Sequence, residues 1–117
     1  MGFAINTSGS ALRAFGTKMA VSANNVANVY SEDFKKSRAL VTEGQNDAVK
    51  VDISKVDADG PVETKMVKGQ AVHQELSNTD IVEELIQQIT AQRAFEANTK
   101  TIRTEDEMLG ALVDMVG

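Results

Sequence analysis

The fold is decided by a stretch in the C-terminal third of the chain, which reads SNTDIVEEL at 77–85, AQRAFEAN at 91–98 and DEML at 106–109. Asp80 and Glu83 form a capping-box pattern at its front. From Asp80 onward there is no proline, and glycine is absent until Gly110. These signals predict one long helix from Asp80 to Val116, which at about 1.5 Å per residue spans about 55 Å.

Apolar residues recur along this predicted helix at heptad spacing, with polar residues among them. The apolar positions include Ile81, Leu85, Ile89, Phe95, Ile102 and Leu109. Gln92 and Asn98 interrupt the stripe, and polar residues in such a seam lower stability while they fix the register of paired helices. A helix of this length and pattern needs a partner helix.

A second helix is predicted near the N-terminus, from about Ile5 to Val29. Its heptad-like stripe consists of Leu12, Phe15, Met19 and Val26, interrupted by small polar residues. Asn24, Asn25 and Asn28 cluster near its end, where asparagine favours a turn. We expect these side chains to hydrogen-bond the backbone where the chain leaves the helix, and so to orient Phe34 for packing on the helices.

Between the helices the pattern changes to alternation of apolar and polar residues. Val49, Val51 and Ile53 alternate with Lys50 and Asp52, which is typical of a half-buried strand. A strong turn signal follows at 57–61, where the only proline of the chain stands. The segment therefore predicts a small meander of two or three strands, with another turn at 43–46.

The predicted fold class is mainly α. The N- and C-terminal helices pair as an antiparallel coiled-coil hairpin, and the small β-meander is inserted between them. Residues 1–32 form the first helix of the core, residues 33–74 the β-rich insertion, and residues 75–117 the second helix.

Composition limits the possible functions. The chain has 117 residues, a net charge of −5 and no cysteine, which argues against nucleic-acid binding and excludes disulfides and thiolate metal sites. No apolar stretch approaches the roughly 18 residues that a membrane helix needs, and no secretory signal peptide is expected. We predict no catalytic site, no metal site and no cofactor, and we expect neither nucleic acid nor direct insertion into a membrane.

Three groups of residues resemble chemical sites, and each has a simpler explanation. His73, with Glu75 and Asp80 nearby, lacks the spacing of a metal site and is better explained as a solvated residue. Glu83 and Glu84 are adjacent on the predicted helix and point about 100° apart, so they are poorly placed to act as paired catalytic carboxylates. They are better explained as negative charges that the positive N-terminal end of the helix dipole favours. The acidic turn at 57–60 lacks the remaining ligand positions of a calcium loop.

Two separate motifs resemble one known family. The segments SAL at 10–12, ANNVAN at 23–28, FK at 34–35 and RA at 38–39 are similar to the N-terminal signature of bacterial flagellar rod and hook proteins. The C-terminal segments quoted above resemble the second signature of the same proteins. The start of the chain and its short length look most like a proximal basal-body rod protein. Asp33 stands where the family commonly has glycine, and the middle segment is much shorter than in hook or distal-rod proteins.

This resemblance implies a structural subunit of the rod, a hollow drive shaft that transmits torque and conducts exported subunits. It implies terminal helices that pack side by side with copies of the chain and with other rod proteins. It also implies passage through the flagellar type III export apparatus without a cleaved signal, and a location in the basal-body rod that crosses the periplasm. The alternatives are a soluble coiled-coil adaptor that never polymerises and another flagellar axial protein of the hook type.

The seam residues and the signature residues together form the predicted interface for helix packing within and between subunits. These residues are Leu12, Phe15, Met19, Asn24, Asn25, Val26, Asn28, Phe34, Ile81, Leu85, Ile89, Gln92, Arg93, Phe95, Asn98, Ile102 and Leu109.

Overall fold

The computed structural model describes the backbone of residues 2–116 and the side chains of residues 5–116. The helices and strands follow one another as α1 (Gly2–Ala27), β1 (Ser37–Glu43), a short 3-10 turn (Gln45–Asp47), β2 (Val49–Lys55), β3 (Val62–Val67), β4 (Gln70–Glu75) and α2 (Ile81–Val116). None of the helices in this part of the chain combines the length and the hydrophobicity that a membrane span requires.

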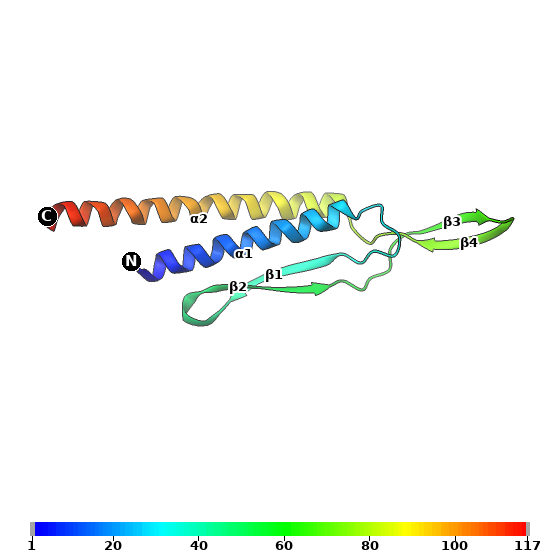
Figure 1. Cartoon of the computed structure of the whole chain (residues 1–117), viewed down its shortest axis with the longest axis horizontal. Helices are drawn as coiled ribbons and strands as arrows, with labels where there is room; N and C mark the ends of the chain where they lie inside the picture. Colours follow the sequence, from blue (N-terminus) through cyan, green and yellow to red (C-terminus); the bar gives the residue numbers. More distant parts are fainter. Residues whose placement is uncertain (1, 117) are drawn as a thin grey trace.

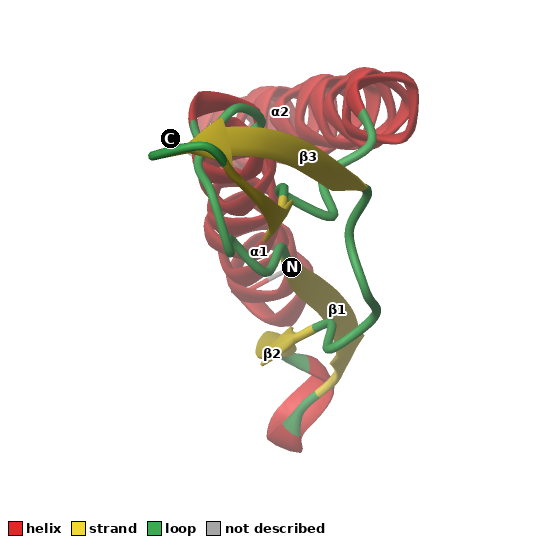
Figure 2. Ribbon diagram, turned by 90° about the vertical axis from the view of Figure 1, so that its right-hand side faces the viewer, coloured by secondary structure: helices red, strands yellow, loops and turns green. Residues whose placement is uncertain are grey.

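The elements form three layers in an extended molecule (Figure 1). α1 and α2 run antiparallel, so that both chain ends lie at the same end of the molecule. α1 lies between α2 and the β1–β2 hairpin, and the view along the molecule in Figure 2 shows the same order. The β3–β4 hairpin extends away from the helices at the opposite end.

Small residues allow α1 to occupy this central layer. Ala11, Ala14, Ser8, Ser10 and Ser22 are buried on α1. Small side chains let both neighbouring layers approach the helix backbone closely, and the hydroxyl groups find partners there. The Ser10 Oγ donates a hydrogen bond to the Thr7 carbonyl (2.8 Å) and accepts one from the Val49 N–H (2.8 Å), which fastens the β1–β2 hairpin to α1.

Each sheet is a single antiparallel hairpin. β1 pairs with β2 from Ser37 opposite Lys55 to Glu43 opposite Val49. β3 pairs with β4 from Val62 opposite Glu75 to Val67 opposite Gln70, and its turn consists of Lys68 (φ 52°) and Gly69 (φ 78°). Two consecutive residues with positive φ form the tight turn that matches the right-handed twist of a hairpin.

The fold class predicted from the sequence is wrong. The two helices do run antiparallel, but the described residues form two separate two-stranded sheets in place of one small meander, in an extended molecule of 83 × 23 × 16 Å. The reason lies in the connection between β2 and β3, which was expected to be a tight turn. The Val56 N–H donates to the Lys36 carbonyl (2.9 Å), and the Leu76 N–H donates to the Pro61 carbonyl (2.7 Å). The backbone around 56–61 therefore bonds to other segments, and β3 pairs with β4 instead of β2.

The start of α2 is capped by Asp80. Its Oδ1 accepts hydrogen bonds from the Val82 N–H (3.0 Å) and the Glu83 N–H (3.4 Å), which satisfies two of the amides that a helix N-terminus leaves unpaired. The Glu83 side chain does not complete a capping box. It pairs instead with the basic side chains of Lys36 and Arg38.

Candidate assembly interface

A buried polar cluster joins α1, α2 and β1. It consists of Asn25, Glu84, Ser22 and the backbone of Ser37. Asn25 and Glu84 are only 1% and 2% exposed. The Asn25 amide donates to a carboxylate oxygen of Glu84 (3.1 Å) and to the Ser37 carbonyl (2.8 Å), while its oxygen accepts from the Ser37 N–H (2.9 Å). The Ser22 hydroxyl donates to the Glu84 carbonyl (3.1 Å). We call this group the polar lock.

The polar lock suits a role in specifying the alignment of three elements. Around it, the fully buried apolar residues of the described chain are all alanines, at positions 11, 14, 39 and 91. Alanine contacts tolerate sliding, because one small side chain packs much like another. A buried asparagine and carboxylate are costly unless they meet, so they favour one register.

A second group of ionic contacts lies beside the polar lock, between β1 and the first turn of α2. The Glu83 carboxylate accepts hydrogen bonds from Arg38 and from Lys36, the latter at 3.2 Å. The bond from Arg38, followed by the bond from Lys36 and the charges of both, holds the pKa of Glu83 below its ordinary value, although partial burial opposes this.

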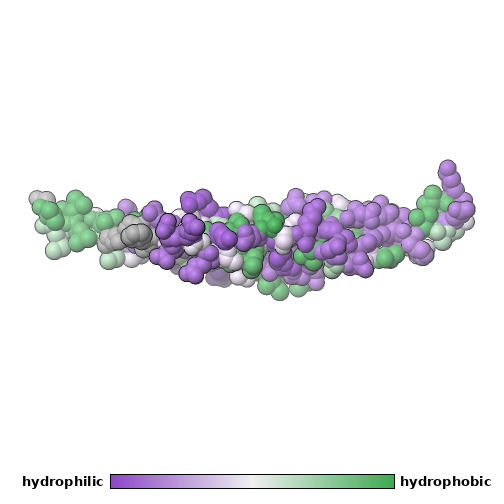
Figure 3. All heavy atoms as spheres, turned by 90° about the horizontal axis from the view of Figure 1, so that it is seen from below, coloured by the Kyte–Doolittle hydropathy of each residue, from purple (hydrophilic) through white to green (hydrophobic). Residues whose placement is uncertain are grey.

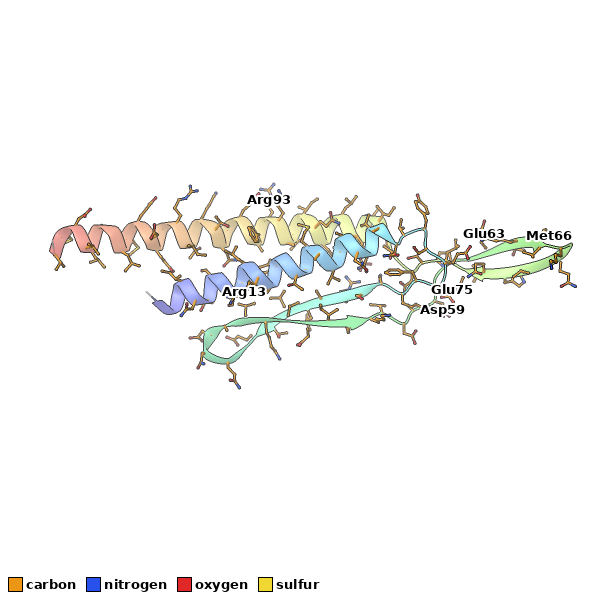
Figure 4. All side chains as sticks on the ribbon, in the orientation of Figure 1. Arg13, Asp59, Glu63, Met66, Glu75 and Arg93 are labelled. Carbon is orange, nitrogen blue, oxygen red and sulfur yellow. The ribbon has the colours of Figure 1, made fainter. Side chains whose placement is uncertain are left out.

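A third group lies at the junction from which the β3–β4 hairpin extends, where Figure 4 places Glu75 and Asp59. The Glu75 carboxylate accepts from Lys35 (2.5 Å) and from the Gly60 N–H (2.9 Å), and these contacts lower its pKa, with Lys35 the larger cause. The Asn78 Oδ1 accepts from the Lys36 N–H (2.7 Å), and its amide donates to the carbonyls of Val56 and Ala58. Asn78 therefore ties three crossing segments together.

These contacts predict that acid weakens the fold. Glu83 has a lower pKa in the folded chain than its ordinary value of 4.5. Its contribution to stability is therefore complete above that value and is lost as the pH falls through the lower, folded pKa. We expect the melting temperature measured by circular dichroism to fall as the pH drops below 4.5. Glu83→Gln should lose about 1 kcal/mol or less at neutral pH and show a smaller dependence on acid. An equally steep fall in both proteins would contradict this account.

The large apolar residues in the first turns of α2 face away from the polar lock. Ile81, Val82, Leu85, Ile86 and Ile89 form one continuous strip along the first turns of the helix, which we call the outer face. They are between 41% and 66% exposed. On the opposite side, α2 turns Glu84, Ala91 and Asn98 toward the rest of the molecule, and Arg93 projects from the side away from α1 (Figure 4). In its first turns α2 thus has a small and polar inner side and an apolar outer side, whereas further along the helix Ile102 and Leu109 lie on the inner side.

The predicted interface residues divide between these two sides. Half-buried positions are Leu12, Phe15, Met19, Val26, Asn28, Phe34, Asn98 and Ile102, and Asn25 is buried. Exposed positions are Asn24, Ile81, Leu85, Ile89, Gln92, Arg93, Phe95 and Leu109. The structure brings Asn25 to α2, but it leaves most of the predicted stripe of α2 without a partner in the same chain.

Sequence reasoning missed several residues that organise this region. They are Glu84, Ser22, Ser37, Asn78 and Gly60. Glu84 was explained by the helix dipole, yet it stands seven residues before Ala91 and fourteen before Asn98, on the inner side. A heptad count that started from small and polar residues would have found it.

The groups considered for chemistry have structural partners. His73 is exposed on β4, and its Nδ1 lies 3.2 Å from the Thr64 hydroxyl. Within the described residues, no cluster of His, Cys, Asp and Glu side chains could hold a metal ion. Asp33 adopts a φ of 59°, a left-handed conformation that glycine adopts without steric cost. This explains why a glycine would be favourable before Phe34.

Comparison with known families matches both ends of the chain. Residues 70–115 match a family described as flagellar basal body rod FlgEFG protein C-terminal, and residues 5–34 match one described as flagella basal body rod protein. The first match contains β4, the junction residue Asn78 and nearly all of α2. The second contains most of α1 and ends at Phe34.

Individual relatives are similar over a shorter stretch. The chain is 56% identical over 36 residues to the flagellar basal-body rod protein FlgG of Borreliella burgdorferi and 46% identical over 41 residues to FlgG of Bacillus subtilis. It is 44% identical over 41 residues to the flagellar hook protein FlgE of Escherichia coli. These stretches cover 31%, 35% and 35% of this chain, but only 14%, 16% and 10% of the three relatives.

Proposed function

Because this chain belongs to the family of flagellar basal-body rod and hook proteins, we propose that it is a structural subunit of the basal-body rod. In this role the chain polymerises through its two helices into a hollow shaft that transmits torque and conducts exported subunits. Its partners are copies of itself and other rod proteins. It reaches the rod, which crosses the periplasm, through the flagellar export apparatus. The role is structural and not catalytic.

The observation that carries this proposal is the distribution of apolar side chains on α2. A self-sufficient domain buries its large apolar residues, whereas here the outer face is exposed and the inner side of the same turns is small and polar. Contiguous exposed apolar surface marks a site of protein–protein contact. A helix pair held in register by the polar lock presents that surface in a defined position, which a regular polymer requires.

The small size of the part between α1 and α2 supports a rod position over a hook position. Here the part between α1 and α2 is limited to two hairpins. Such a subunit contributes mostly to the helical core of an axial structure and little to its exterior.

Substitutions on the outer face test the proposal. We expect Leu85→Asp combined with Ile89→Asp to abolish incorporation into the basal body and motility, because a charge is then buried at each subunit contact. The folded monomer should keep its helix content, since both side chains are exposed in the single chain. Motility on soft agar, together with immunoblots of isolated basal bodies from a complemented deletion strain, measures the effect.

Thr101→Asp supplies the matched control, because Thr101 is exposed on the same helix but lies about three turns beyond the last residue of the outer face. It should support normal motility. Normal incorporation of the double variant would contradict the proposal that the outer face is the subunit contact. A chain found only in the soluble fraction would favour the coiled-coil adaptor instead.

A further inference from the structure

Apolar side chains are also uncovered at the two extreme ends of the molecule (Figure 3). At one end, Leu109, Leu112, Val113 and Val116 follow the helical spacing of three and four, so they share one face of the last turns of α2. We call this the tail face. Its residues are between 37% and 88% exposed. No described residue from 106 to 116 is even half-buried, so the tail face has no cover within the described chain.

At the opposite end, the β3–β4 hairpin presents a second apolar surface. Val62, Thr64 and Met66 stand at alternate positions of β3, with His73 opposite Thr64 and Ala71 opposite Met66, so these side chains share one face. The polar pair Thr64 and His73 separates Val62 from Met66 on this face. We call Val62, Met66 and Ala71 the hairpin face. Met66 is 70% exposed, and it lies near the outer end of the hairpin in Figure 4. A two-stranded hairpin without a packed face is marginally stable in water, so a covering surface would stabilise it.

The charges around the two faces are complementary. The tail region from 104 to 116 carries Glu105, Asp106, Glu107 and Asp114 and no basic residue. The outer part of the hairpin, from 64 to 74, carries Lys65 and Lys68 and no acidic residue. Lys65 lies on the opposite side of β3 from Met66 and pairs with Glu32 of its own chain, whereas Lys68 stands in the turn at the far tip. The acidic residues Glu63 and Glu75 lie at the inner end of the hairpin, so the basic charge that faces a partner is that of Lys68.

The dipole of α2 also favours a basic partner at the C-terminal end of the helix. The carbonyl groups of the last turn of a helix are unpaired and carry partial negative charge, which a nearby cation stabilises. The last turn of α2 contains no basic residue. A lysine supplied by another molecule would therefore complement the helix end as well as the four carboxylates.

We propose that the hairpin face of one copy packs on the tail face of a second copy, end to end. The two faces lie at opposite ends of a molecule 83 Å long, so one chain cannot join them by itself. Because the contact joins two different surfaces, each added copy leaves one face of each kind open, and the contact propagates along a line. This inference deepens the proposed function, on which it rests for the expectation that copies assemble, and it adds an axial contact distinct from the outer face.

Two variants that each block one face test the contact by mixing. Met66→Asp blocks the hairpin face, and Leu112→Asp blocks the tail face; Ile53→Asp, an exposed apolar residue on β2, is the control. In light scattering over a concentration series, we expect the native chain and the control to grow in mass, and each blocked variant to associate at least tenfold more weakly. An equal mixture of the two blocked variants should form dimers and nothing longer, because only one intact pair of faces remains.

Several outcomes would overturn the contact. The proposed contact is wrong if the native chain stays monomeric, or if the blocked variants assemble as strongly as the native chain. Dimers of Leu112→Asp alone would show that hairpins pair with hairpins, and dimers of Met66→Asp alone would show that tails pair with tails. Circular dichroism confirms that each variant keeps the helix content of the native chain.

Crosslinking separates this inference from the proposed function. The chain has no cysteine, so Met66→Cys and Leu112→Cys introduce single reactive positions. We expect a mixture of these two proteins to give a crosslinked dimer, while a mixture of Met66→Cys with Ile53→Cys gives none. If basal bodies contain the chain but no crosslink forms, in solution or in those basal bodies, the end contact is wrong and the rod role stands. If basal bodies lack the chain, the rod role fails.

Discussion

Replacement of Gly60 by alanine should destabilise this chain by about 3 kcal/mol, because the junction has no room for a Cβ atom. A Cβ at this position would lie 2.1 Å from the Leu76 carbonyl oxygen and 3.1 Å from the Ser77 carbonyl carbon. Both are backbone atoms, so rotation of a side chain cannot relieve the clash. The shift would also disturb the hydrogen bond from the Gly60 N–H to Glu75. Urea unfolding monitored by circular dichroism measures the loss.

Gly16→Ala is the matched control for this experiment. Gly16 is exposed in the middle of α1, and nothing lies within 4 Å of the position that its Cβ would take. The same change should there stabilise the helix by about 1 kcal/mol, because alanine has the higher helix propensity. If both variants shifted stability in the same direction, the close approach at the junction would be wrong.

Substitution of Asn25 by alanine is the second change with a large expected effect. It removes the side-chain donor to the buried Glu84 carboxylate and both hydrogen bonds to the Ser37 backbone. A hydrogen bond to a charged group contributes about 1.5–3 kcal/mol, and each buried polar group left unsatisfied costs about 1–3 kcal/mol, so the loss of all three bonds amounts to several kcal/mol. Since a typical domain is stable by only about 5–15 kcal/mol, and the buried apolar residues here are all alanines, Asn25→Ala should leave the free chain largely unfolded at moderate temperature.

Two further variants show whether the loss of stability in Asn25→Ala comes from the polar lock or from a general weakening of the end of α1. Asn24 is the exposed neighbour of Asn25, so Asn24→Ala should change the free energy of unfolding by no more than about 0.5 kcal/mol. Asn25→Leu combined with Glu84→Met replaces both partners by apolar groups and should be more stable than Asn25→Ala alone. A double variant as unstable as the sum of two single losses would show that the residues do not act as a pair.

Local patterns in the sequence are sufficient to predict where the helices lie. Asp80 supplies an N-cap before a stretch without proline, and α2 begins at Ile81 and continues to Val116. The alternation of Val49, Val51 and Ile53 likewise lies within β2. These features depend on residues that are close in the sequence, so periodicity and capping rules detect them.

Local patterns in the sequence do not reveal which segments pair with one another. The signal around Pro61 is that of a turn, but a turn signal does not say which strands it joins. Gly60 is packed under the Leu76 carbonyl, and Asn78 holds three segments through its single side chain. These contacts join residues far apart in the sequence, and only the folded chain reveals them.

The partner of the apolar stripe of α2 could not be predicted from the sequence either. Heptad spacing showed that Ile81, Leu85 and Ile89 share a face, but it did not show what that face contacts. The structure turns these residues outward and places Glu84 and Ala91 inside. The reason is that α1 approaches α2 through small and polar residues, for which large aliphatic side chains would be too bulky.

The most direct test of the account is electron microscopy of basal bodies isolated from the bacterium that makes this chain, with the deletion strain beside them. The account predicts that the rod contains density for the paired helices, with the outer face of α2 buried against neighbouring subunits, and that the rod is missing or truncated in the deletion strain. An intact rod in the deletion strain, with the native chain found only in the soluble fraction, would contradict it.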